Sequence, residues 1–209
     1  MSNTVQTPKA PSLPFATVQY DKQYIDQLNN VLRLYFNQLD NTFQSILSVA
    51  GGAAFKFPNG SFYLDTQQTI PVINTAYAIP FTDTATSNQV AIGTTTSHIE
   101  IGVSGYYNFQ FSLQLAKTGG SNVGIWVWPR VNGDDIADSN TKLQLTGSSS
   151  SESVAAWNFV LPMNAGDYFQ LMWAADDTRA IIKAEAANAF SPAIPPAILT
   201  ATFVSALYS

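Results

Sequence analysis

The sequence predicts a mainly β protein in which an N-terminal arm and one amphipathic helix precede an antiparallel sandwich or barrel. Three observations lead to this fold class. Proline recurs at Pro8, Pro11 and Pro14, and apolar residues follow a heptad spacing between residues 20 and 50. Short strand patterns separated by turn residues then fill residues 53–209, and no helical pattern interrupts them.

Residues 1–19 are predicted to form an extended arm. Each proline fixes its own φ angle, removes a backbone donor and biases the residue before it away from helix. One interpretation is a disordered tail. The functional interpretation is a segment that lies extended on a larger assembly, with Leu13, Phe15 and Val18 as its apolar anchors.

Residues 20–50 are predicted to form a coiled-coil-like helix that ends at Gly51-Gly52. Its apolar positions are separated by alternating steps of three and four residues, which is the heptad period of a left-handed supercoil. This trimer helix seam consists of Ile25, Leu28, Leu32, Tyr35, Leu39, Thr42, Ile46 and Val49.

The positions beside the seam are also apolar, with Tyr24 and Val31 on one side and Phe36 and Phe43 on the other. A two-stranded coiled coil usually carries charges there. The wider stripe fits three helices, or one helix that packs on its own domain. Since bulky Tyr35 also needs a roomy core, we expect a homotrimer.

Within residues 53–209, Ala53–Phe57 and Ser61–Leu64 are predicted to be strands joined by a turn at Pro58-Asn59-Gly60. The clearest strand pattern is Tyr106–Ala116, where Tyr107, Phe109, Phe111 and Leu113 share the inner face. The remaining strands are predicted at Val123–Val131, which ends in an Asn132-Gly133 turn, and at Lys142–Thr146, Val154–Leu161, Tyr168–Ala175, Arg179–Ala184 and Ile198–Tyr208.

Two of these strands, Val123–Val131 and Tyr168–Ala175, are apolar on both faces. A free-standing antiparallel sandwich normally shows polar residues on its outer face. A loop or the helix of the same chain could cover the second face, or a symmetry-related copy could. In the second case Trp126, Trp128 and Trp173 are candidates for the trimer face of the head.

Composition excludes several classes of protein. The chain is 46% hydrophobic and only 11% charged, which does not fit a disordered chain. Nine basic residues and a net charge of −5 give no cationic field for nucleic acid. The absence of cysteine excludes disulfides and thiolate chemistry. No stretch approaches the roughly 18 apolar residues of a membrane span, so we expect no membrane insertion.

Four short motifs resemble the jelly rolls of the tumour-necrosis-factor and complement-head families. They are Gly105-Tyr106-Tyr107-Asn108-Phe109, Asn132-Gly133-Asp134, Leu161–Asp167 and Ala201-Thr202-Phe203-Val204, and the resemblance covers residues 75–208. It implies a jelly-roll sandwich that forms trimers, with Phe203 in the core. Four runs, Tyr107–Ala116, Trp126–Asn132, Ala155–Val160 and Leu171–Ala175, also resemble a domain that recurs in virion proteins of tailed phages from marine and cyanobacterial hosts.

Catalytic signals are weak. His98 is the only histidine, and it lies in a strand-like run. The chain has no Gly-x-Ser-x-Gly elbow that would supply a nucleophilic serine for it. Asp134, Asp135 and Asp138 follow a turn, where they either cap the turn or hold calcium. We expect no enzymatic activity, no metal and no cofactor.

The expected function is that of a non-enzymatic phage structural protein, a trimeric fibre or capsid-decorating (cement or head-fibre) protein. Its arm would dock on other capsid or tail proteins, and its jelly-roll head would face outward from a virion assembled in the host cytoplasm. One alternative is a tail-fibre knob that binds a host glycan, with Tyr77 or Trp157 stacking on sugar rings. Another is a glycan hydrolase, which needs a carboxylate pair that the sequence does not identify.

Overall fold

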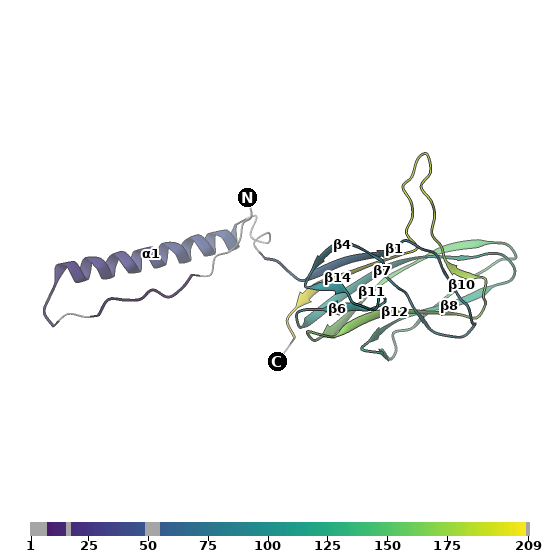
Figure 1. Cartoon of the computed structure of the whole chain (residues 1–209), viewed down its shortest axis with the longest axis horizontal. Helices are drawn as coiled ribbons and strands as arrows, with labels where there is room; N and C mark the ends of the chain where they lie inside the picture. The colour runs from purple at the N-terminus through teal and green to yellow at the C-terminus, as the bar shows by residue number, and fades with distance from the viewer. Residues whose placement is uncertain (1–7, 16–17, 49–54, 208–209) are drawn as a thin grey trace. The chain divides into compact units, whose positions relative to one another are not determined.

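The computed structural model describes residues 8–15, 18–48 and 55–207 (Figure 1). The chain divides into two compact units, Met1–Lys56 and Phe57–Ser209. The first holds the arm and the only helix of the described residues, and the second, called the head below, holds all of their strands.

Helix α1 spans Lys22–Leu47, close to the predicted range. It begins at Asp21, whose side chain accepts a hydrogen bond of 2.8 Å from the Gln23 N–H and so satisfies one of the free donors of the first turn. It ends at Ser48 in an extended conformation. The predicted stop at Gly51-Gly52 lies outside the described residues.

The head is a sandwich of two antiparallel sheets. In sheet one, β11 (Ser151–Met163) pairs with β7 (Gly105–Lys117), and the order continues through β14 (Ala197–Ser205), β1 (Asn59–Leu64) and β4 (Asp83–Asn88). Two short strands, β13 (Ala180–Ile182) and β2 (Gln68–Thr69), extend the β14 side of β7.

Sheet two has the order β10 (Thr141–Leu145), β8 (Val123–Val131), β12 (Tyr168–Ala175), β6 (Ile99–Ile101) and β5 (Val90–Ile92). Short β3 (Tyr77–Ala78) adds to β12, and β9 (Asp134–Asp135) adds to β8. The chain passes repeatedly from one sheet to the other, and the first and last long strands of the head lie side by side (Figure 1). This is a jelly-roll sandwich.

The core lies between the two sheets and is built from the inward residues of each strand. Strand β7 alternates along its length, and Phe109 stacks on Phe169 of the opposite sheet with ring centroids 4.1 Å apart. Gly105 begins β7 because the Phe203 ring covers it, and a Cβ atom there would lie 2.3 Å from a ring carbon. Gly105 and Phe203, which belong to two different motifs of the sequence, therefore pack against each other.

Two strand predictions need correction. Pro58-Asn59-Gly60 is not a turn, because Asn59 and Gly60 lie within β1 and pair with Thr202 and Ala201. Gly60 serves close packing, since a Cβ atom there would lie 2.4 Å from the Phe62 ring. Residues 55–58 form no strand, and residues 53–54 lie outside the described residues. The last strand ends at Ser205, before Tyr208, which is also outside them.

The Asn132-Gly133 turn is confirmed, with φ angles of 51° and 90°. Its Asn132 side chain also reaches the turn between β11 and β12, where it donates to Asp167 at 2.7 Å and accepts from the Tyr168 N–H at 3.0 Å. Asp167 in turn accepts from the Asn164 N–H, and this hydrogen bond lowers the pKa of its carboxyl. Two separate motifs of the sequence therefore hold one end of the sandwich together.

Candidate assembly surfaces

The helix seam lies on α1, where no side chain is buried. The seven described seam residues, Ile25, Leu28, Leu32, Tyr35, Leu39, Thr42 and Ile46, are each partly exposed, and Val49 lies outside the described residues. Thr42 satisfies its hydroxyl locally, because it donates to the Gln38 carbonyl at 2.9 Å. Thr42 is the only polar residue of the seam, and its hydroxyl can therefore be buried in an apolar interface without losing its hydrogen bond.

The apolar stripe of α1 is wider than the seam. Phe36 and Phe43 beside it are each 57% exposed, and Leu34 and Leu47 are exposed as well. Most of the stability of a helix of this length in a protein comes from packing of its apolar face rather than from intrinsic propensity. Helix α1 thus presents a face that its own described unit does not bury.

The arm runs beside the helix (Figure 1). Ser12–Phe15 and the helix residues Gln27, Asn30 and Val31 surround a shallow hollow of about 400 Å³. The proposed anchors stay open to solvent: Leu13 is half exposed, and Phe15 and Val18 are almost completely exposed. Three apolar side chains of the arm are therefore available for contact.

The predicted core residues of the head lie together between the sheets. Tyr107, Phe109, Phe111 and Leu113 are buried, and Phe203 is partly buried against them. The Tyr107 ring meets the Phe203 ring edge-on at 5.6 Å, and its hydroxyl donates to the Val103 carbonyl at 2.7 Å. Burial raises the pKa of this hydroxyl.

The three tryptophans predicted for one trimer face do not share a face. Trp126 and Trp128 lie on the outer face of sheet two, where Lys142 covers the Trp126 ring at 4.6 Å and the Trp128 indole donates to Asp135 at 2.7 Å. Trp173 is 1% exposed and faces the core, because it pairs with inward-facing Val127. A side chain inside the core cannot contact another copy, so Trp173 is removed from the candidate face.

A surface that sequence reasoning missed is the outer face of sheet one. Cross-strand partners point to the same side, so the outward residues follow from the register. From β11, β7 and β14 they are Glu152, Val154, Ala156, Asn158, Val160, Pro162, Tyr106, Asn108, Gln110, Ser112, Gln114, Ile198, Thr200, Thr202 and Val204. Among these residues only Glu152 is charged. The sequence indicates this surface only through the absence of charged residues from Ser153 to Ala165. Apolar residues occur on both sides of β11, so its pattern does not show which side is buried.

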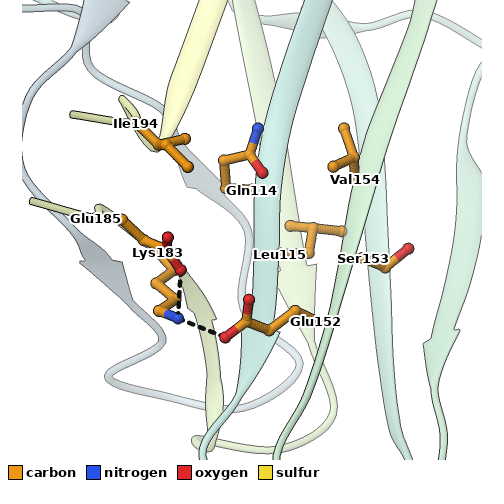
Figure 2. Close-up of a pocket in the computed structure, with 8 residues that line it drawn as sticks. All are labelled: Gln114, Leu115, Glu152, Ser153, Val154, Lys183, Glu185 and Ile194. Atoms are coloured by element: carbon orange, nitrogen blue, oxygen red, sulfur yellow. Dashed lines mark hydrogen bonds and ion pairs between the residues drawn. The ribbon is translucent and has the colours of Figure 1, made fainter. Parts of the chain in front are cut away.

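At one end of this face, the Lys183 ammonium lies between the carboxylates of Glu152 and Glu185 (Figure 2). Its ammonium donates to Glu185 at 2.6 Å and also to Glu152 of β11. These hydrogen bonds raise the pKa of Lys183. The three side chains line a pocket of about 240 Å³ together with Gln114, Leu115, Ser153, Val154 and Ile194. Their charges pair with one another, and this ties β11 to the segment that follows β13.

The side chains considered as catalytic or calcium-binding candidates take part in contacts that support the fold. His98 stacks on the Tyr168 ring with centroids 3.8 Å apart. Asp135 accepts hydrogen bonds from Arg130 and Trp128, which lower the pKa of its carboxyl. Asp138 has a φ angle of 58°, as expected for a turn residue. In the described part of the chain, no three histidine, cysteine or acidic residues are grouped as metal ligands.

The aromatic residues suggested for sugar stacking are also engaged. The Trp157 ring meets the Phe111 ring at 4.6 Å and faces the core, and the Tyr77 hydroxyl accepts a hydrogen bond from the Val72 N–H at 3.2 Å. No helix among the described residues is long and apolar enough to span a bilayer.

Comparison with known proteins gave similarity at the level of structure only. No protein-family model and no curated protein sequence matches this chain. Among solved structures, the globular domain of the zebrafish complement 1qA protein is similar at 14% identity and a TM-score of 0.47, over 73% of this chain and 100% of that one. The Eiger TNF of S. frugiperda is similar at 8% identity and a TM-score of 0.48, over 74% and 97%.

Proposed function

We propose that this protein is a non-enzymatic structural subunit of a virion, a fibre or capsid-decorating protein that acts as a homotrimer. In this proposal α1 joins the three copies, the arm anchors them to other virion proteins, and the head faces outward. The observation that carries it is the apolar stripe of α1, which has the heptad spacing of a helical bundle and no buried side chain.

The helix needs partners for energetic reasons. Its 26 residues are about 39 Å long, and every one of its leucine and isoleucine seam residues is partly exposed to water. Complete burial of one such side chain contributes roughly 1.5–3 kcal/mol. Exposed Phe36 and Phe43 extend the stripe beyond the width of a two-helix seam. Three copies, each contributing this wide stripe, would bury it on all sides.

The virion setting and the absence of enzymatic activity are supported by other features. Four strand runs, Tyr107–Ala116, Trp126–Asn132, Ala155–Val160 and Leu171–Ala175, resemble a domain of tailed-phage structural proteins. The outward residues of β7 and β14 are uncharged, and His98, Asp135 and Lys183 are engaged in stacking or ion pairs. Low charge and uncharged faces are typical of subunits that stay assembled.

The first test is the mass of the full chain in solution. Sedimentation equilibrium at micromolar concentration should give three times the 22.6 kDa chain mass. A stable, compact monomer would contradict the proposal. The second test uses antibodies against the head on intact viral particles from the host that carries the gene. Label on the capsid lattice or a vertex supports a decorating protein, label on the tail supports a fibre, and unlabelled particles contradict the virion role.

The alternative function is a tail-fibre knob that binds a host glycan. It draws less support, because the suggested Trp157 faces the core and Lys142 covers the half-buried Trp126 ring. Binding of the purified trimer to a glycan array would favour this alternative over a purely structural role.

A further inference from the structure

The arm has one face that is partly buried. Pro8, Pro11 and Pro14 are each partly buried, whereas the residues between them are exposed. Prolines at this spacing favour the polyproline II conformation, in which three residues make one turn and every third residue therefore shares a face. The three prolines form this proline face of the arm, and exposed Leu13 and Phe15 lie outside it.

The proline face lies against α1. Pro14 of the arm and Val31 of the helix line the same hollow, together with Gln27 and Asn30. A polyproline II segment rises about 3.1 Å per residue and an α-helix about 1.5 Å. Residues 8–15 are therefore long enough to run beside about 15 helical residues, which is more than half of α1.

The two flanks of the helix seam differ in burial. Tyr24 and Val31 on one flank are partly buried, whereas Phe36 and Phe43 on the other flank are each 57% exposed. Helix α1 has no buried side chain, so no core of its own explains the difference. Because Val31 lines the hollow beside the arm, we assign the burial of this flank, called the covered flank below, to the arm.

The proposed trimer needs the covered flank as well. In a bundle of three helices each apolar stripe packs against two neighbours, and neighbouring axes lie about 8–10 Å apart. At that distance the side chains of the two helices interlock, and no room is left between them for an extended chain. The covered flank can therefore hold either the arm or a neighbouring helix.

We propose that the arm competes with the neighbouring helices for the covered flank, so that the arm shields α1 in the single chain and leaves it when three copies assemble. This inference rests on the proposed homotrimer and names how its assembly is regulated. Release exposes the proline face beside Leu13 and Phe15, so the whole arm becomes available to other virion proteins. Such coupling is reciprocal, because a protein that binds the released arm must also favour the trimer.

The first test loosens the arm. The full-length variant with Pro8→Ser, Pro11→Ser and Pro14→Ser should assemble at a lower concentration than the unmodified chain. If the arm shields about four of five single chains, its release raises the competent population about fivefold. Because three competent chains must meet, the midpoint concentration of trimer dissociation then falls about tenfold. Fluorescence-detected sedimentation over a dilution series measures this midpoint, and an unchanged or higher value would overturn the competition.

A matched control changes two arm residues outside the proline face. Lys9 and Ala10 are both exposed, so Lys9→Ser with Ala10→Ser should leave the midpoint unchanged. An equal shift in this control would show that assembly does not depend on the proline face, which also overturns the competition.

The second test fixes the arm to the helix. The chain has no cysteine, so the full-length variant Pro14→Cys with Val31→Cys can be bridged within one chain by a short bifunctional thiol reagent, below the midpoint concentration of the trimer. The bridged chain should sediment as a monomer at micromolar concentration and keep its helix by circular dichroism. The same variant with its two thiols blocked separately is the control and should be trimeric. Failure of the bridge to form would overturn the contact between arm and helix.

The masses separate this inference from the trimer itself. A bridged chain that is still trimeric would overturn the competition while the homotrimer stands. An unmodified chain that is monomeric at every concentration would overturn the homotrimer and the competition together.

Discussion

The two units of this chain differ in what they bury. Every buried apolar side chain of the described residues lies in the head, whereas α1 buries none of its 26 residues. The head therefore holds a complete core within one chain. The helix has a well-spaced apolar face but no core within its own described unit, and the proposed trimer would supply one. The difference separates a unit with its own core from one that we propose to be completed by assembly.

The largest expected effect comes from charge in the helix seam. Leu32→Asp with Leu39→Asp should abolish helix-mediated association, because unpaired carboxylates are costly to bury. Sedimentation should show loss of the stable trimer, and circular dichroism should show loss of helix. The melting transition of the head should remain.

A matched control adds the same charge outside the seam. Asn37→Asp with Gln44→Glu places two carboxylates on exposed positions of α1 and should leave the mass unchanged. If the seam variant stays fully trimeric with its helix intact, then α1 is not the trimer core and the comparison between the units breaks down.

The next effect concerns the core of the head. Phe109→Ala removes a buried ring that stacks on Phe169, and it should lower the free energy of unfolding of the head by about 3–5 kcal/mol. Phe43→Ala on α1 is the paired variant, since Phe43 is exposed. Urea unfolding followed by tryptophan fluorescence should detect the first change and leave the head midpoint of the second unaltered.

A smaller effect is expected at Lys117, which is 1% exposed. Its ammonium donates to the carbonyls of Gly120, Ser121 and Gly147, at 2.8, 3.1 and 2.6 Å, and so joins two loops. Lys117→Met leaves these acceptors without a donor and should destabilise the head by about 1–3 kcal/mol in thermal unfolding. Exposed Lys142→Met is the control and should cost less, about 0.5–1 kcal/mol. Equal losses would contradict a special role for Lys117.

The smallest effect is a pH dependence at Asp177. Hydrogen bonds from the Arg179 side chain and backbone lower the pKa of this carboxyl to about 2. Its contribution to stability is therefore complete above about pH 4 and is lost as the pH falls toward 2. Urea unfolding should show Asp177→Asn less stable than the unmodified chain at pH 7, with the gap closing below about pH 4. A gap that does not depend on pH would contradict this.

A residue pattern predicts the local structure where it has one structural solution. Strict alternation located β7, and the Asn132-Gly133 pair located a turn. Heptad spacing located α1 to within a few residues of its ends. These patterns are local, because period and turn chemistry depend on the backbone conformation of neighbouring residues.

A residue pattern is insufficient where the conformation or the buried side depends on distant residues. Trp173 lies in a strand with apolar residues on both sides, and only pairing with Val127 decides that it faces the core. Pro58-Asn59-Gly60 has the composition of a turn, but pairing with β14 extends Asn59 and Gly60 into a strand. The segment between β13 and β14 carries no periodic pattern, so nothing in residues 183–196 marks Phe190 as exposed.

Hydrophobic period alone predicts a mainly β head behind an arm and a heptad helix, since it sets which element a segment forms and which side it can bury. Which of these sides are covered depends on the folded arrangement of distant strands. Trp173 faces the core, the uncharged outward residues of β7 and β14 share one face, and Phe190 is exposed. Burial depends on pairs of distant segments, because strand register and sheet order exist only once the chain has folded.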